Sequence, residues 1–185
     1  WDLDGTLVDS GELHWRAWVE TMAAEGIAIT REQFLASFGR RNDSFVPEWL
    51  GEGATPERVE RVGEEKEARY RRLVREHGLA PLPGAARWLA RLQEEGWAQA
   101  VASSAPRCNV EIMLEALDFR GCFQALVAAE DVQKGKPHPE VFLTAAARLE
   151  VEPFRCVVVE DAAAGVEAAR RAGMRSIGVA RGGAR

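Results

Sequence analysis

Residues 1–10 read WDLDGTLVDS, in which a single apolar residue separates two carboxylates. If this stretch ends an extended strand, Asp2 and Asp4 emerge on the same side, because successive side chains of a strand point to opposite faces. Gly5 allows the backbone to turn sharply after them, and Thr6 adds a hydroxyl at the same edge. Two anions this close repel each other unless a cation lies beside them, and their oxygens suit Mg²⁺. The stretch predicts a divalent-metal site, with an acidic turn that merely ends a strand as the alternative.

A run of proline and glycine at 79–84 separates two parts of different character. Before it, apolar spacing and capping residues predict helices at 12–25, 30–38, 42–50 and 57–77. After it, strands predicted at 97–103, 123–128, 156–160 and 176–180 alternate with helices at 85–96, 107–117, 139–149 and 162–173. The apolar run at 157–159 lacks polar alternation, as in a strand covered on both faces. We expect an α/β fold with a doubly wound, Rossmann-like parallel sheet from 1–11 and 82–185, and an inserted all-α cap domain from 12–81 that includes the hinges.

Polar residues follow the predicted strands where an open parallel sheet binds its ligands, outside the carboxyl ends. Ser103 and Ser104 come at the end of one strand, where hydroxyls and exposed backbone N–H groups can bind phosphate oxygens, although serines there also form turns. Glu160 and Asp161 directly follow another strand. Acids at a buried strand end are costly without a cation, although acids also cap helices.

A lysine-containing loop precedes the helix at 139–149, with Lys134 and Lys136 as its cations. Pro137 holds Lys136 in an extended backbone conformation. An ammonium presented so rigidly can neutralise an anionic nucleophile and a phosphoryl group. The alternative is a solvated basic loop.

In their order along the chain, these features resemble the motifs of the haloacid dehalogenase superfamily of phosphotransferases. The resemblance implies that Asp2 is the nucleophile and Asp4 the general acid and base. The second aspartate favours phosphate ester chemistry, because dehalogenases proper and phosphonate-cleaving members lack it. The family's second motif matches Ser103, and its third motif selects Lys136, which leaves Lys134 at the surface.

The fourth motif of the family matches the acids that follow the strand at 156–160. It implies Mg²⁺ bound by Asp2, by the backbone carbonyl of Asp4 and by Asp161, with Glu160 binding directly or through water. The predicted phosphate-binding residues are Thr6, Ser103, Ser104 and Lys136. The resemblance thus predicts a Mg²⁺-dependent phosphotransferase that forms an aspartyl phosphate.

Within the predicted cap, His14, Arg41 and Lys66 match positions of the β-phosphoglucomutase branch of the superfamily. The match at Arg41 needs a short deletion. His14 could instead be a packing residue, and Lys66 one half of a surface i,i+4 ion pair. A phosphatase acting on a small sugar phosphate or related monoester is our first prediction, and a β-phosphoglucomutase that interconverts hexose 1- and 6-phosphates is the alternative. A noncatalytic phospho-receiver-like domain is disfavoured by the large cap and by Asp4.

Composition limits the remaining classes of function. A chain of 185 residues with a formal charge of -5 has no basic footprint for nucleic acid and no apolar run long enough for a membrane span. Three cysteines, Cys108, Cys122 and Cys156, are too few for a disulfide framework, read as small core residues, and favour the cytoplasm. We expect a small phosphorylated metabolite as partner and a monomer, with a dimer as the alternative. We also expect further sequence before Trp1 and after Arg185.

Overall fold

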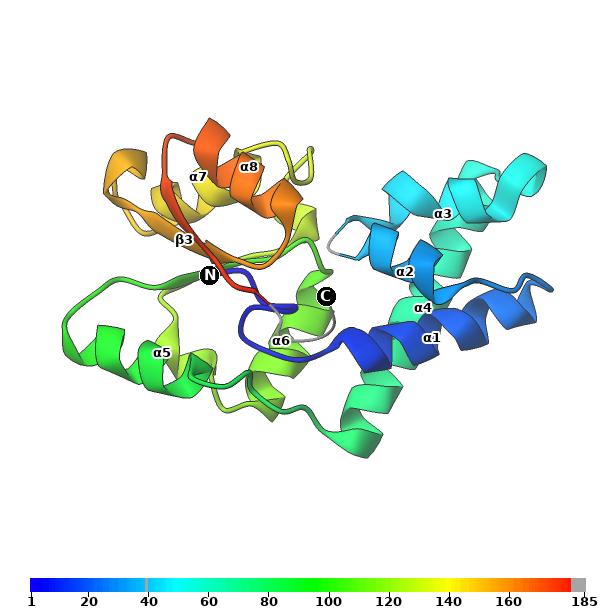
Figure 1. Cartoon of the computed structure of the whole chain (residues 1–185), viewed down its shortest axis with the longest axis horizontal. Helices are drawn as coiled ribbons and strands as arrows, with labels where there is room; N and C mark the ends of the chain where they lie inside the picture. Colours follow the sequence, from blue (N-terminus) through cyan, green and yellow to red (C-terminus); the bar gives the residue numbers. More distant parts are fainter. Residues whose placement is uncertain (39, 181–185) are drawn as a thin grey trace. The chain divides into compact units, whose positions relative to one another are not determined.

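The computed structural model describes residues 1–38 and 40–180. The chain forms two compact units, of which one comprises Trp1–Asp9 with Leu79–Arg185 and the other comprises Ser10–Gly78. The first is called the α/β unit below. The second is called the helical unit, because the regular elements among its described residues are all helices (Figure 1).

Parallel strands form the centre of the α/β unit. β1 (Ala100–Ala102) pairs with β2 (Ala125–Val127), and β3 (Val157–Glu160) pairs with β4 (Arg175–Gly178). These strands confirm the predicted parallel sheet, but each of them is shorter than the range predicted from the sequence.

The opening residues join the two strand pairs. The backbone N of Trp1 donates to the carbonyl of Ala100 at 2.8 Å, and its carbonyl accepts from the N–H of Ala102 at 2.8 Å. The N–H of Asp2 donates to the carbonyl of Val159 at 3.0 Å on the other side. The order is therefore β2, β1, the opening residues, β3 and β4, and Asp2 lies at the centre of the sheet. These bonds are made by Trp1 and Asp2, and the backbone turns shortly after them at Gly5, whose φ of 88° glycine adopts readily.

Helices cover both faces of the sheet, as in a doubly wound fold (Figure 1). The helices of this unit are α5 Ala85–Glu94, α6 Arg107–Ala116, α7 Glu140–Arg148 and α8 Ala163–Arg171. Of these, α7 and α8 pack on one face of the sheet, and α5 and α6 lie on the other. Short 3₁₀ turns lie at η2 Arg120–Cys122, η3 Ala129–Asp131 and η4 Pro153–Arg155. Val158 is buried beneath α8, whereas Val157 is exposed, so the expectation that the run at 157–159 is covered on both faces is wrong at Val157. Cys108 is exposed and is therefore not the core residue that the sequence suggested.

The helical unit follows the predicted pattern closely. It contains α1 Gly11–Ala24, α2 Arg31–Ser37, α3 Asn42–Leu50, η1 Gly51–Gly53 and α4 Pro56–His77. Thr30 caps α2 in a reciprocal capping box with Gln33, and Thr55 accepts a hydrogen bond from the N–H of Arg58 at the start of α4. Gly39, the predicted end of the helix at 30–38, lies outside the described residues.

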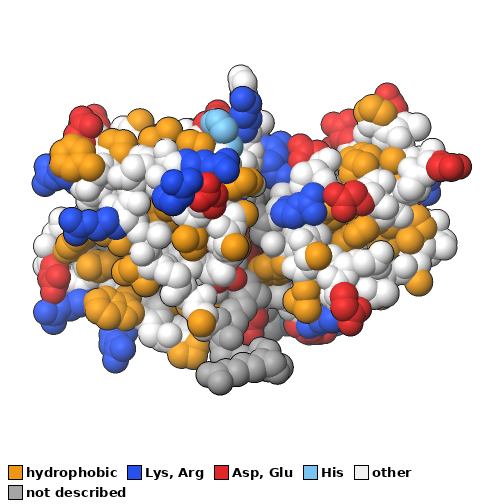
Figure 2. All heavy atoms as spheres, turned by 45° about the horizontal axis from the view of Figure 1, so that its top comes forward, with side chains coloured by type: hydrophobic (Ala, Val, Ile, Leu, Met, Phe, Trp, Pro, Cys, Tyr) orange, Lys and Arg blue, Asp and Glu red, His pale blue; other side chains and the backbone are white. Residues whose placement is uncertain are grey.

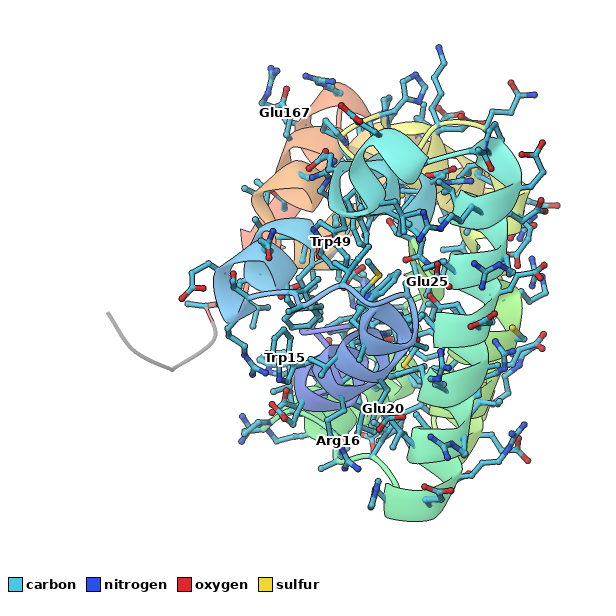
Figure 3. The ribbon with its side chains drawn as sticks, turned by 90° about the vertical axis from the view of Figure 1, so that its right-hand side faces the viewer. Trp15, Arg16, Glu20, Glu25, Trp49 and Glu167 are labelled. Carbon is cyan, nitrogen blue, oxygen red and sulfur yellow. The ribbon has the colours of Figure 1, made fainter. Side chains whose placement is uncertain are left out.

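α1 and α4 are held together by an apolar core and by ion pairs. Trp18 and Met22 of α1 are buried in a cluster that includes Val62 of α4. Glu20 and Glu25 face α4 (Figure 3), where Glu20 pairs with Arg72 at 3.0 Å, and Glu25 pairs with arginines of the first turns of α4. The charges of α4 therefore serve packing within the unit as well as solvation.

The surface carries charges of both signs. On the face shown in Figure 2, basic and acidic side chains are interspersed with hydrophobic ones rather than gathered by sign. This agrees with a composition of 24 basic and 29 acidic residues. Among the described helices, none has the length and apolar character needed to cross a bilayer.

Candidate active site

Asp2 and Glu160 converge on one buried ammonium in the α/β unit. Lys136 donates from Nζ to Oδ1 of Asp2 at 2.6 Å and to Oε2 of Glu160 at 2.7 Å. The side chains are 9%, 1% and 3% exposed for Asp2, Glu160 and Lys136, so little water screens these charges. The fold thus brings together a lysine and an aspartate that are 134 positions apart in the sequence.

The carboxylate of Glu160 is bound on both of its oxygens. Oε2 accepts from Lys136, while Oε1 accepts from the backbone N–H groups of Asp161 at 3.2 Å and Ala162 at 3.0 Å. Gly165 of α8 passes so close that a Cβ there would lie 2.0 Å from Oε2. Glu160 is therefore well placed to fix Lys136, and its position depends on the absence of a side chain at residue 165.

Asp161 and the turn after Asp2 complete the polar cluster. Asp2, Glu160 and Asp161 each offer a carboxylate oxygen, and these oxygens lie within 4.8 Å of one another. The Thr6 hydroxyl donates to Oδ1 of Asp161 at a long 3.5 Å. Asp4 lies near enough for its charge to raise the pKa of Asp2. Clustered carboxylate oxygens are the donor set that Mg²⁺ prefers, so these residues fit the metal that the sequence predicts.

Burial and neighbouring charges shift both partners of the central ion pair. The pKa of Asp2 is raised to about 6, first by burial and then by the charges of Glu160 and Asp4, against the opposing effect of Lys136. Burial by itself lowers the pKa of Lys136, but Asp2 and Glu160 outweigh it, and the net shift is upward. Lys136 is therefore a permanent cation beside a carboxylate that is ionised at neutral pH.

Ser103 lies beside Asp2 at the same sheet edge, because it directly follows the β1 residue that bonds to Trp1. Its side chain is buried, and its Oγ accepts from the N–H of Ala105 at 3.0 Å. Ser104 is half-buried in the same turn. Lys134 is exposed, in agreement with its assignment to the surface.

His14 and Lys66, predicted separately from the sequence, lie together in the helical unit. Nζ of Lys66 is 2.8 Å from Nδ1 of His14, and the His14 ring stacks on Tyr70 with centroids 3.8 Å apart. Lys66 is 2% exposed, so the alternative of a surface i,i+4 pair is wrong. His14 thus packs on Tyr70, as the alternative expected, and also makes a polar contact with Lys66, while its predicted role toward a substrate stays a prediction.

Arg41, the third predicted cap residue, is not part of this cluster. It is the N-cap of α3, and its guanidinium pairs with Asp43 at 3.1 Å. The side chains of Arg41 and Asp43 are 28% and 62% exposed, so the pair is partly solvated.

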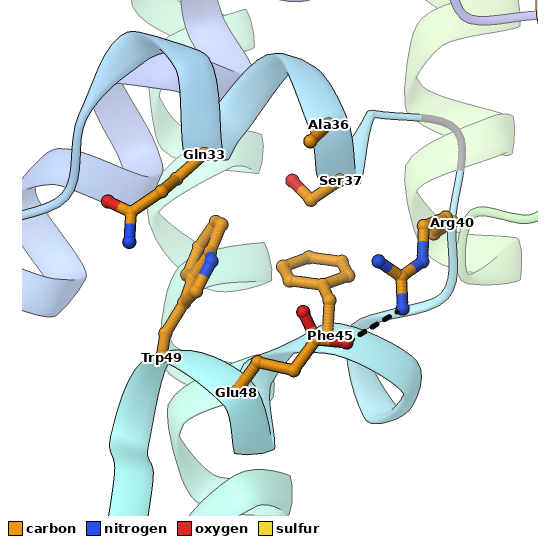
Figure 4. A pocket seen from close by; sticks show the side chains of 7 residues that line it. All are labelled: Gln33, Ala36, Ser37, Arg40, Phe45, Glu48 and Trp49. Atoms are coloured by element: carbon orange, nitrogen blue, oxygen red, sulfur yellow. Dashed lines mark hydrogen bonds and ion pairs between the residues drawn. The ribbon is translucent and has the colours of Figure 1, made fainter.

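A separate pocket lies inside the helical unit between α2 and α3 (Figure 4). Its lining residues are Gln33, Ala36, Ser37, Arg40, Phe45, Glu48 and Trp49. Arg40 and Glu48 pair at 3.1 Å and offset each other's charge. None of the predicted cap residues lines this pocket.

Sequence reasoning missed Glu67, a buried carboxylate that binds the ammonium of Lys66 at 2.9 Å. The signal was present in the spacing of α4, because Val62, Lys66 and Tyr70 recur at helical intervals on its buried side. A lysine on a buried stripe requires a partner, and the next residue supplies it.

Comparisons with known proteins place this site in a family. Residues 1–179 match the model of haloacid dehalogenase-like hydrolases. Hexitol phosphatase B of Escherichia coli (strain K12) is 39% identical over 179 residues, which cover 95% of this chain and 80% of the relative. Beta-phosphoglucomutase of Bacillus subtilis (strain 168) is 34% identical over 189 residues, covering 98% and 82%. The crystal structure of beta-phosphoglucomutase from Clostridium difficile superposes with a TM-score of 0.89 at 29% identity, over 97% of this chain and 82% of that one.

Proposed function

The chain belongs to the haloacid dehalogenase-like hydrolase family, and we propose that it is a Mg²⁺-dependent phosphatase that hydrolyses a small sugar phosphate or related phosphomonoester. The observation that carries this proposal is the buried cluster in which Asp2 meets Lys136 beside Glu160 and Asp161. A buried carboxylate held by a permanent cation next to further acids fits a nucleophile for phosphoryl transfer.

In the first step a carboxylate oxygen of Asp2 attacks phosphorus, and the bond from phosphorus to the ester oxygen breaks. Asp4 gives a proton to the leaving alcohol, so the alcohol departs neutral. The ammonium of Lys136, 2.6 Å from Asp2, stabilises the negative charge of the transferring group. An aspartyl phosphate on Asp2 remains.

In the second step Asp4, now ionised, takes a proton from water as the water oxygen attacks the aspartyl phosphate. The bond from phosphorus to Asp2 breaks, and inorganic phosphate leaves. Throughout, Glu160 holds Lys136 in place through its 2.7 Å contact.

The acidic cluster supports a metal at this site. Asp2 and Asp161, with Glu160 alongside, would hold Mg²⁺, which when bound offsets the negative charge of the phosphoryl oxygens. We assign phosphate contacts to Thr6, Ser103, Ser104 and Lys136, and substrate contacts to His14, Arg41 and Lys66.

Similarity to hexitol phosphatase B supports a hexitol phosphate as the first substrate to test. A β-phosphoglucomutase is the second candidate, favoured by the pairing of His14 with Lys66 and by similarity to the mutases. The free thiols support a reducing compartment such as the cytoplasm.

The test follows phosphate release and isomerisation together. The protein is incubated with Mg²⁺ and either sorbitol 6-phosphate or β-glucose 1-phosphate, the latter with and without a trace of glucose 1,6-bisphosphate. Phosphate release that EDTA and Asp2→Asn abolish supports the phosphatase. Glucose 6-phosphate that forms without phosphate, and faster with the bisphosphate, identifies the mutase instead.

A further inference from the structure

The positive charge of Lys66 is enclosed within the helical unit. Its Nζ lies 5.2 Å and 5.4 Å from the ring centroids of Trp18 and Tyr70, and it contacts Nδ1 of His14 at 2.8 Å and Oε1 of Glu67 at 2.9 Å. Because lysine only donates hydrogen bonds, Nδ1 of His14 accepts here and the ring proton lies on Nε2. Two of the three N–H donors of the ammonium are thus engaged by His14 and Glu67.

Glu67 carries the charge that balances this lysine. Its side chain is 8% exposed, and the same Oε1 also accepts from Nδ2 of Asn42 at 2.7 Å. Burial by itself raises the pKa of Glu67, but its polar neighbours, Lys66 first, outweigh it and the net shift is downward. Glu67 is therefore ionised at neutral pH, and the pair has a net charge near zero.

Arg41, the second cation assigned to the cap, is also paired with a carboxylate. It pairs with Asp43 at 3.1 Å, and water reaches this pair, whose side chains are 28% and 62% exposed. Lys66 and Glu67 are both buried, and breaking their pair would leave an uncompensated charge. The lysine therefore cannot be released to a new anion as easily as the arginine can.

From these contacts we propose that Glu67 is a specificity-determining residue, which cancels the charge of Lys66 so that the helical unit accepts the hydroxyl groups of a monophosphate and disfavours a second phosphate. The inference rests on the proposed phosphatase function and deepens it. A neutral hydroxyl can accept from the ammonium of Lys66, whereas a second phosphate would meet the carboxylate of Glu67 as well as the ammonium. A mutase that turns over a bisphosphate needs the opposite balance.

The experiment compares one monophosphate with one bisphosphate in a single reaction. KM is measured for the monoester that the wild-type protein hydrolyses fastest, and sorbitol 6-phosphate is the first monoester tried. The Ki of glucose 1,6-bisphosphate is measured as a competitive inhibitor of that reaction. In Glu67→Gln, a shape-conserving change that removes the carboxylate charge, we expect Ki/KM to fall by about tenfold or more. The kcat for the monoester is measured alongside, so that a loss of turnover is distinguished from a change in specificity.

Two further variants test whether charge is the cause. Glu64→Gln removes one charge from an exposed position of the same helix, and Ki/KM should stay at its wild-type value. Lys66→Met leaves Glu67 without its cation and should raise the Ki of the bisphosphate. This change, opposite in direction to that expected for Glu67→Gln, tests the proposal if Glu67→Gln does not fold.

The possible results separate the inference from the function on which it rests. If wild-type protein releases phosphate and folded Glu67→Gln keeps Ki/KM within about twofold of wild type, charge matching by Glu67 is refuted while the phosphatase stands. An unchanged or lower Ki of the bisphosphate in Lys66→Met refutes it as well. If the wild-type protein hydrolyses no phosphate ester, the proposed function fails and the inference fails with it.

Discussion

Gly165→Ala gives the sharpest test of how the site is built. Replacing glycine by alanine inside a helix normally stabilises it by up to about 1 kcal/mol. Here the new Cβ would lie 2.0 Å from Oε2 and 2.1 Å from Cδ of Glu160, where an unstrained contact needs about 3.5 Å. Because the obstacle is a buried carboxylate held on both oxygens, either α8 or Glu160 has to move by more than about 1 Å.

Moving Glu160 disrupts its ion pair with Lys136, and moving α8 disturbs the packing on β3. Either response should lower the free energy of unfolding by about 2–4 kcal/mol, which combines overpacking with a weakened buried ion pair. Phosphatase activity should fall as well, because Lys136 loses a partner that positions it. The assay is urea unfolding followed by far-UV circular dichroism, together with phosphate release.

Gly63→Ala is the matched control. Gly63 lies inside α4, where a Cβ would be 3.7 Å from Nδ2 of Asn42, an ordinary contact. This substitution should leave the stability unchanged or raise it by up to about 1 kcal/mol. If Gly165→Ala is also within about 0.5 kcal/mol of the wild type, the packing of α8 on Glu160 has been misread.

Three further outcomes follow from the α/β unit. Asp2→Asn should abolish phosphate release with an unchanged circular dichroism spectrum, and activity above a few per cent would mean that the nucleophile is misassigned. Lys136→Met should lower the free energy of unfolding by about 3–5 kcal/mol, because Asp2 and Glu160 then lie buried without their cation; a variant as stable as the wild type in urea would contradict this. Asp131→Asn should lower the free energy of unfolding by about 2 kcal/mol at pH 7, because hydrogen bonding to Arg148 holds the pKa of Asp131 at about 2. Because its pKa is depressed in the folded protein, Asp131 stabilises the fold fully above the unfolded pKa near 4, and this stabilisation is lost as the pH falls through 2. The difference in free energy of unfolding between wild type and Asp131→Asn should therefore be smaller at pH 3 than at pH 7. A difference that stays constant would refute the assignment.

Local patterns predicted most of the helices and the order of the elements. Thr30 and Thr55 begin their helices as expected, and α3 spans the predicted residues 42–50. Strand lengths were predicted less well, because a strand is bounded by its partners across the sheet rather than by its own residues. The exposed Val157 shows the same limit, since an apolar run does not reveal which residues are covered.

The sequence by itself determined which residue types follow each strand and therefore the chemistry available at the sheet edge. It placed Asp2, Lys136 and Glu160 on the right elements, because periodicity, caps and turns are local properties. Only the tertiary structure decided that Lys136 bridges Asp2 and Glu160, and that Lys66 and Glu67 are buried as a pair. The reason is physical: burial and the distance between charges depend on how strands order and helices pack, and these two quantities decide what a charged side chain does.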